Sequence, residues 1–352
     1  MSFAIRGLLE GFYDRLWTWA ERERVADHAA ELGFDTYVYA PKEDRLQNAG
    51  WRQPYPPDQV ERLTAFAERC RGLGLAPWFG MRPVGFSYAD AADAGRLADK
   101  LSAAVEMGAE RILLLADDIP PTLEEGTAGR FARLEDAHAW LVEHALGVLD
   151  GGVPLAFCPT DYAGGGSPYL ERLGALLPPE VDLCWTGAEV CSSRITASEA
   201  VEIGRVLRRP PLIWDNYPVN DAGMTRELHI GPIRDRDPEL AGVTRGILVN
   251  AALQPEAGLV PLATWADYLQ DPAGYDPEAA FERATLRAAG EDAVALRTIA
   301  AAFDRSAIRQ GWERPEPAAL EVALERLPRF SNRALAADLS ALVGSQSAAD
   351  DR

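Results

Sequence analysis

The sequence has 352 residues, of which 47% are hydrophobic and 25% are charged. This length suits one large domain or two average ones, and the composition is that of an ordinary globular protein. The net charge of −19 excludes nucleic acid and anionic membrane as main partners, because both are polyanions.

The N-terminal stretch MSFAIRGLLEGFYD lacks the basic start and the long apolar core of a signal peptide. No later apolar run in the sequence is long enough to span a bilayer. We therefore expect a cytoplasmic protein with no membrane partner.

Eight short apolar runs rich in β-forming residues follow one another through the first three quarters of the chain. They lie at 5–12, 34–41, 75–83, 110–118, 153–162, 181–188, 211–219 and 246–253. Amphipathic helical stretches separate most of them, at 17–32, 57–73, 91–107, 134–149 and 197–207. Near-continuous apolar strands that alternate with helices are typical of a parallel sheet covered on both faces.

Eight strand–helix units within residues 1–275 fit a closed (β/α)8 TIM barrel, which typically takes ~250 residues. An open, doubly wound sheet is the alternative, and it usually carries a glycine-rich phosphate loop after its first strand. The chain has EGFYDR (10–15) at that place, with no GxGxxG pattern. We therefore predict an α/β fold whose catalytic or binding domain is the barrel.

The pattern changes after about residue 275. Segments 277–289, 291–311, 316–326 and 330–344 are rich in Ala, Leu, Glu and Arg and contain no strand pattern. They predict a small C-terminal α-helical appendage over residues 276–345, which packs on the barrel or forms a homodimer. We expect the tail, 346–352, to be disordered.

Polar or aromatic residues follow every predicted strand. In a barrel of this kind the site lies at the C-terminal ends of the strands. Each residue alone has an ordinary explanation as a loop, cap or core residue. Together they form a ring of carboxylate, amide, lysine and aromatic groups that suits a sugar. The ring consists of Gly11, Lys42, Arg82, Asp117, Asp118, Asp161, Tyr162, Trp185, Thr186, Trp214, Asp215, Asn216, Asn220, Asp221 and Asn250.

Other kinds of catalytic site find no support in the sequence. The four cysteines, Cys70, Cys158, Cys184 and Cys191, form no CxxC pair, and the four histidines show no zinc-ligand spacing. We expect reduced thiols, no metal and no cofactor. Since there is also no Gx-Ser-xG elbow, the chemistry must depend on carboxylates, and glycoside hydrolysis is the reaction that carboxylates carry out.

Seven motifs, each at the end of a predicted strand, resemble glycoside hydrolase family 84. This family comprises β-N-acetylglucosaminidases, among them the O-GlcNAc-removing enzymes and bacterial hyaluronidase-type hexosaminidases. The motifs are RGLLEGFY (6–13), TYVYAPKED (36–44), LLLADDI (113–119), FCPTDY (157–162), CWTGAEVCS (184–192), IWDNYPVND (213–221) and ILVNAALQPEAGLVPLATW (247–265). The resemblance runs from about residue 5 to residue 270 and keeps the order of the family's motifs.

The resemblance implies a (β/α)8 barrel that removes terminal β-linked GlcNAc with retention, through the substrate's own 2-acetamido oxygen and an oxazoline intermediate. Asp117 would orient and polarise the acetamido N–H. Asp118 would be the general acid and then the base that activates water. Because adjacent carboxylates at the end of a buried strand do not both ionise easily, we expect one to be protonated near neutral pH.

The remaining roles follow from the same resemblance. Tyr162 would hydrogen-bond the acetamido oxygen, and Asn216 would support the acetamido group. The pocket for the N-acetyl methyl would consist of Cys158, Thr186 and Trp214. The sugar hydroxyls would be held by Gly11, through its carbonyl, and by Lys42, Asp221 and Asn250.

The chain departs from the family's pattern at two positions. Asp14 replaces the usual glycine after EGFY, and Arg82 with Pro83 replaces a small turn after the third strand. We expect both side chains at the rim of the site, where they bear on the choice of aglycone. The alternatives are a barrel that binds a sugar or glycoprotein without cleaving it, or the same chemistry on β-GalNAc glycosides or cell-wall fragments.

Overall fold

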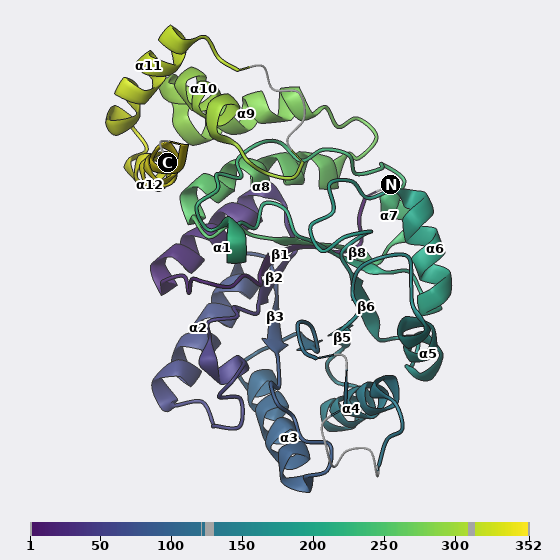
Figure 1. Ribbon diagram of the computed structural model, residues 1–352. Coiled ribbons are helices and arrows are strands. Elements are labelled where there is room, and N and C mark those ends of the chain that lie inside the picture. Colours follow the sequence, from purple (N-terminus) through teal and green to yellow (C-terminus); the bar gives the residue numbers. More distant parts are fainter. Residues whose placement is uncertain (1, 121, 124–129, 309–313, 351–352) are drawn as a thin grey trace.

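The computed structural model describes residues 2–120, 122–123, 130–308 and 314–350. Eight parallel strands close into a barrel in the order β1 to β8, and β8 pairs with β1 (Figure 1). The predicted (β/α)8 fold is therefore confirmed. The strands are β1 (Arg6–Glu10), β2 (Thr36–Tyr39), β3 (Ala76–Met81), β4 (Arg111–Leu115), β5 (Leu155–Cys158), β6 (Asp182–Trp185), β7 (Leu212–Asp215) and β8 (Gly246–Asn250).

Helices surround the barrel and cover the outer face of its sheet (Figure 1). They are α1 (Trp19–Leu32), α2 (Pro57–Gly72), α3 (Ala91–Glu106), α4 (Leu134–Leu149), α5 (Pro168–Leu176), α6 (Ala197–Leu207), α7 (Leu240–Val243) and α8 (Pro255–Gln270). Local sequence sets their ends. Thr18 and Glu21 form a capping box at the start of α1, and Gly33 ends that helix with φ at 88°.

Two hydrophobic cores follow from the alternation of side chains along each strand. One set points into the barrel, where Leu9, Val38, Leu113 and Leu248 pack together with other fully or almost fully buried residues. The other set points outward and packs under the surrounding helices. The strands are therefore buried on both faces, as their continuous apolar sequences predict.

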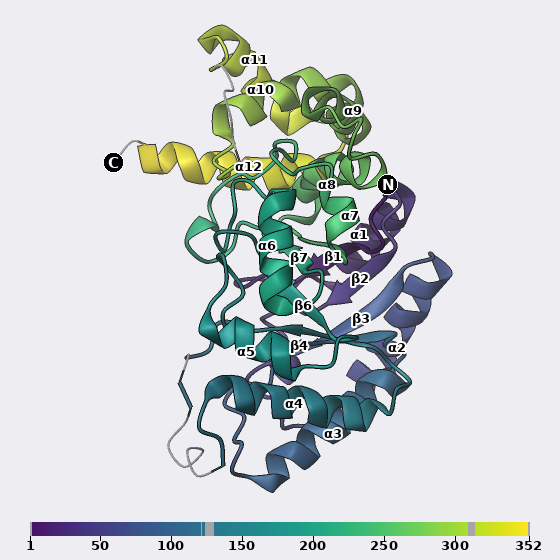
Figure 2. The ribbon, with the colours of Figure 1, turned by 90° about the vertical axis from the view of Figure 1, so that its right-hand side faces the viewer.

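The C-terminal segment forms four helices, α9 (Pro277–Ala289), α10 (Ala293–Phe303), α11 (Pro317–Arg326) and α12 (Arg333–Asp350). They lie together on the side of the barrel where α8 runs (Figure 2). Asp338 of α12 accepts hydrogen bonds from the backbone N–H groups of Glu256 and Ala257, at 2.9 and 3.1 Å. The appendage thus supplies an acidic cap for the first turn of α8.

Two predicted boundaries differ from the structure. The helix predicted over 291–311 ends at Phe303, because the buried Asp304 is extended and accepts the backbone N–H groups of Gly231 and Ser306. Helix α12 continues to Asp350, into the tail that the sequence predicted to be disordered. Residues 309–313 and 351–352 lie outside the described residues, and the boundary at 275 falls between α8 and α9.

None of the helices in the described ranges is both long enough and apolar enough to cross a membrane.

A buried ion pair joins β1 to α1. Arg22 donates two hydrogen bonds to Glu10, at 2.7 and 2.6 Å, and the hydroxyl of Tyr37 donates a third at 2.9 Å. Glu10 is 0% exposed and Arg22 is 1% exposed. Burial of two charges is costly, and the contacts offset this cost only while both partners are present.

We expect Arg22→Met to lower the free energy of unfolding by about 3–5 kcal/mol, because it leaves the Glu10 carboxylate buried without its cation. The double variant Glu10→Gln/Arg22→Met should recover part of this loss. Arg69→Met is the control, since Arg69 pairs with Asp27 on the surface and should cost less than about 1 kcal/mol. Urea unfolding measures all three, and an Arg22→Met protein as stable as the control would contradict the argument.

Candidate active site

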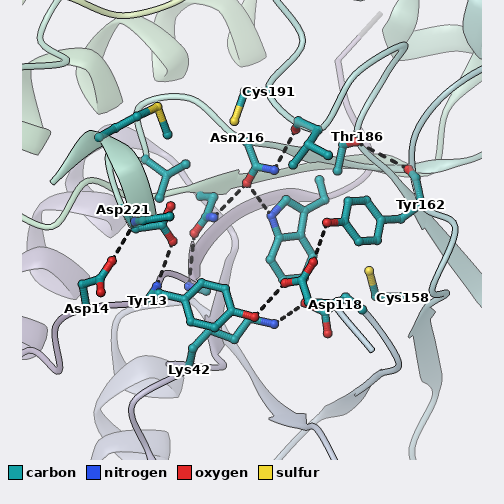
Figure 3. A pocket seen from close by; sticks show the side chains of 18 residues that line it. Tyr13, Asp14, Lys42, Asp118, Cys158, Tyr162, Thr186, Cys191, Asn216 and Asp221 are labelled. Carbon is teal, nitrogen blue, oxygen red and sulfur yellow. Dashed lines mark hydrogen bonds and ion pairs between the residues drawn. The ribbon is translucent and has the colours of Figure 1, made fainter. Parts of the chain in front are cut away.

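A cavity of about 560 Å³ lies at the C-terminal ends of the strands. All eleven residues to which the family resemblance assigns a role line it, and they come from seven of the eight strand ends. They are Gly11, Lys42, Asp117, Asp118, Cys158, Tyr162, Thr186, Trp214, Asn216, Asp221 and Asn250. The other members of the predicted ring do not line it; these are Arg82, Asp161, Trp185, Asp215 and Asn220. Figure 3 shows how the side chains from these loops converge.

Asp117, which follows β4, is 4% exposed and faces two cations. Lys42 forms an ion pair with its Oδ2, and Arg82 Nε lies 3.4 Å from its Oδ1. Within the described residues, Oδ1 accepts no hydrogen bond. Two cations beside a buried carboxylate stabilise its negative charge. Asp117 therefore belongs to the cavity lining, with its Oδ1 enclosed beside Arg82.

Asp118 differs from its neighbour in backbone and in partners. Its φ is 52°, in the left-handed region that residues other than glycine seldom adopt. Its side chain accepts hydrogen bonds from the hydroxyls of Tyr13 and Tyr162, each at 2.7 Å (Figure 3). The turn thus directs two adjacent carboxylates into different surroundings.

The electrostatics of Asp118 correct one prediction. Burial raises the pKa of this carboxyl. The two tyrosine hydroxyls and the charges of Lys42 and Arg82 together outweigh this effect, so the pKa lies below its ordinary value. From the sequence we expected one carboxyl of the pair to be protonated near neutral pH. That expectation considered only repulsion between the carboxylates and did not include the donors that the fold gathers around them.

Arg82 was expected at the rim, and this placement is wrong. Its side chain is 12% exposed, and it donates to the backbone carbonyl of Asp117 at 3.2 and 3.0 Å and to that of Asp118 at 3.1 Å. Arg82 follows β3, the strand beside β4, so its guanidinium reaches across to the turn after β4. It binds the backbone of the carboxylate pair instead of facing solvent.

Asp14 lies in the cavity lining, as expected of a residue near the rim. Its φ is 67°, and its carboxylate accepts the backbone N–H of Ala222 at 2.7 Å. The neighbouring Tyr13 donates its backbone N–H to Asp221 at 2.8 Å. Burial and the nearby Asp14 charge raise the pKa of Asp221. These contacts join the loop after β1 to the segment that follows β7.

Amide side chains form one wall of the cavity. Asn250 accepts the backbone N–H of Gly11 at 3.2 Å and donates to Asn216 at 2.9 Å. Asn216 also accepts the indole N–H of Trp214 at 2.9 Å. A Cβ at Gly11 would lie 2.8 Å from the Trp214 ring, so only glycine allows the backbone to approach so closely. The network fixes the orientation of groups on β1, β7 and β8.

The adjoining wall consists of residues from the ends of β5 and β6, and β6 lies beside β7. The carbonyl of Tyr162 accepts the backbone N–H of Thr186 at 2.9 Å. Cys158 is buried, and burial together with a hydrogen bond to the neighbouring Cys184 raises the pKa of its thiol well above the ordinary value. Cys158 is therefore a protonated wall residue and not an activated nucleophile.

Several lining residues were not predicted. Tyr13 belongs to the EGFY motif, which is the signal that pointed to it, but its contact with Asp118 joins residues 105 positions apart. The others are Val190, Cys191, Val219, Ala222 and Met224, from the loops after β6 and β7. No periodic pattern marks these loop residues in the sequence. Within the described ranges, no group of three or more His, Cys, Asp or Glu side chains is placed to hold a metal ion.

The fold and the cavity together define a barrel enzyme of the class that works through carboxylates at the C-terminal face of its sheet. A family model described as beta-N-acetylglucosaminidase matches residues 6–301. The chain therefore belongs to the β-N-acetylglucosaminidase family, which is a family of glycoside hydrolases.

Known relatives agree with this assignment. Protein O-GlcNAcase of Rattus norvegicus is 29% identical over 270 residues, which cover 74% of this chain and 29% of the rat protein. The chain thus spans less than a third of the length of that curated relative. A mutant of the Thermobaculum terrenum O-GlcNAc hydrolase has 31% identity and a TM-score of 0.85, and the match covers 99% of this chain and 78% of that one.

A further solved structure, CpGH84B, has a TM-score of 0.81 over 99% of this chain and 70% of the other. At 21% identity, this similarity concerns the fold alone.

We expect Arg82→Met to reduce kcat on an aryl β-GlcNAc glycoside by about 100-fold with little change in KM, because the carboxylate pair shifts while the sugar pocket stays intact. Arg82→Lys should recover only part of kcat, since lysine keeps the charge but lacks the planar fork that spans two carbonyls. Steady-state kinetics measures both effects. Arg69→Met, which removes a surface arginine, is the control.

The prediction fails if Arg82→Met retains wild-type kcat, or if it raises KM alone. Thermal unfolding of each variant separates lost positioning from lost folding. Partial recovery of kcat in Arg82→Lys is the second criterion. If Arg82 only filled space, Arg82→Met would retain as much kcat as Arg82→Lys.

Proposed function

We propose that the protein is a retaining exo-β-N-acetylglucosaminidase that uses the substrate's 2-acetamido group as its nucleophile. The observation that carries the proposal is the contrast between two adjacent carboxylates. Asp117 is buried between Lys42 and Arg82, whereas Asp118 lies at the cavity with two tyrosine hydroxyls. One carboxylate is thus suited to hold a charge and the other to exchange a proton.

Asp117 is a poor candidate for a covalent nucleophile. Its charge is already shared with two cations, and its side chain is almost fully buried. Its carboxylate belongs to the cavity lining and suits the acceptance of an N–H group. We infer that this N–H is that of the acetamido group, and that the negative charge of Asp117 stabilises the positive charge that develops on the group as its oxygen attacks C1.

Asp118 would act as the acid and then as the base. In the first step the acetamido oxygen forms a bond to C1, the bond from C1 to the leaving oxygen breaks, and the Asp118 proton passes to that oxygen. In the second step Asp118 takes a proton from water, the water oxygen forms a bond to C1, and the bond from C1 to the acetamido oxygen breaks. The sugar covers Asp118 and removes water from it, and loss of water raises the pKa of a carboxyl. Sugar binding would therefore favour the protonated form of Asp118, which its lowered pKa disfavours in the free protein.

The other lining residues would hold the sugar. Tyr162 would turn its one hydroxyl proton from Asp118 to the acetamido oxygen, and Asn216 would support the same group. The pocket for the methyl would be formed by Cys158, Thr186 and Trp214, and the hydroxyls would be bound by the carbonyl of Gly11 and by Lys42, Asp221 and Asn250. The fixed orientations of Asn216 and Asn250 support these roles, because pre-set amides lose little freedom on binding.

We propose terminal β-linked GlcNAc, including GlcNAc on protein hydroxyls, as the substrate class. The names of the relatives, protein O-GlcNAcase and O-GlcNAc hydrolase, support this class. No cofactor enters the proposal, because the acetamido group supplies the nucleophile.

We expect Asp118→Asn to lower kcat on a simple alkyl β-GlcNAc glycoside by about 10²–10⁴-fold, the usual contribution of a general acid. With a strongly activated aryl leaving group the loss should be much smaller, because that group departs without a proton. Comparing kcat for both substrates in wild type, Asp118→Asn and the surface control Asp58→Asn tests the role. Equal losses on both substrates would contradict it. Binding of an oxazoline mimic without any turnover by wild type would indicate a sugar-binding barrel.

We expect Tyr13→Phe to move the alkaline limb of the kcat/KM profile to higher pH. The Tyr13 hydroxyl stabilises the Asp118 carboxylate, so its removal raises the pKa of Asp118 and keeps the acid protonated further up the pH scale. Tyr275→Phe removes a hydroxyl that donates to the carbonyl of Ile233 and serves as the control. A limb that stays in place or moves to lower pH would exclude Asp118 as the acid.

A further inference from the structure

A second cavity of about 410 Å³ meets the first one at Asp118. It is formed by the segments after β3 and β4 and by α4. Its lining is mainly apolar and aromatic, and it includes Val84, Phe86, Tyr88, Ile119, Leu123 and Leu141. Asp118 is the one residue that lines both cavities within the described part of the chain.

The position of Asp118 determines what each cavity would hold. A general acid must contact the glycosidic oxygen, which joins the sugar to its aglycone. The polar residues of the first cavity suit the sugar. The group on the other side of the oxygen then lies beyond Asp118, which also lines the second cavity. A substrate bound across Asp118 would occupy both.

We propose that the second cavity is the aglycone subsite and that it takes a small apolar or aromatic aglycone. This inference rests on the proposed function. Arg82 and Asp118 are the only charged residues in the described lining, and the guanidinium of Arg82 is already bound to the carbonyls of Asp117 and Asp118. The remaining wall offers aromatic and aliphatic surface, so transfer of an apolar group from water drives its occupation.

His138 of α4 adds one polar feature to this wall. Its side chain is fully buried, and burial lowers its pKa to about 3, so the ring is neutral. Nδ1 lies 2.7 Å from the hydroxyl of Tyr169, whose oxygen accepts the backbone N–H of Thr160 at 3.3 Å. Either tautomer of the neutral ring satisfies this contact, because a hydroxyl can both donate and accept.

Nε2 makes no hydrogen bond within the described residues. The ring is fully buried, so the surface that a ligand would meet is apolar and aromatic. This wall thus fits an apolar aglycone better than a charged group.

The test compares methyl and 2-phenylethyl β-GlcNAc glycosides, whose alcohols are leaving groups of similar basicity. We expect wild type to have a kcat/KM at least about tenfold higher for the phenylethyl glycoside, because transfer of the phenyl group from water into the cavity is favourable. Val84→Phe, which fills the cavity, should reduce this ratio at least about fivefold. Val60→Phe makes the same change on the exposed face of α2 and should keep the wild-type ratio.

Thr122→Trp fills the cavity from an exposed position and replaces Val84→Phe if that variant does not fold. A wild-type ratio near one overturns the inference, and so does a ratio that survives in a folded filling variant. Absence of turnover with any β-GlcNAc glycoside removes the proposed function and this inference with it. Turnover with a ratio near one removes this inference alone.

Discussion

The buried charge of Asp117 is the constraint on which the site depends. An isolated carboxylate at such a position would be very unfavourable, and two cations offset that cost. Lys42 follows β2, Arg82 follows β3 and Asp117 follows β4, so the ion pairs form only if three neighbouring strands hold one register. The ladders fix it by pairing Tyr39 with Phe79 and Met81 with Leu114. A shift by one residue would reverse every side chain and separate the charges.

The same cluster explains how adjacent aspartates acquire different properties. The left-handed backbone at Asp118 costs free energy and persists only where its surroundings enforce it. Arg82 enforces it, because its guanidinium binds the carbonyl before and the carbonyl after the Cα of Asp118. Asp117 is consequently held among cations inside the barrel end, while Asp118 turns towards Tyr13 and Tyr162. Backbone strain at one residue thus produces two chemical environments.

Local periodicity made most of the fold predictable. The helical patterns at 134–149 and 197–207 coincide with α4 and α6. Burial of an apolar face determines both the spacing of the apolar residues and the extent of the helix. Because parallel strands end at one face of a barrel, residues after the strands could be assigned to one site from order alone. The direction in which a long side chain points could not be predicted from the order of the residues. Arg82 turned inward because acceptors lie behind the carboxylate pair, and the hydroxyl of Tyr13 reached Asp118 across the barrel. The lowered pKa of Asp118 depends on both contacts.

If Asp118 is the acid, its place in the linings of both cavities would also link binding to proton transfer. Burial is the largest influence on the pKa of Asp118, and it raises that pKa, while four polar or charged neighbours oppose it. A sugar in the first cavity removes water from one side of the carboxyl, and an apolar group in the second removes it from the other. Each step favours the protonated acid. An aglycone that fills the second cavity would then increase kcat as well as affinity, because its binding energy is used to prepare the proton that the leaving oxygen requires.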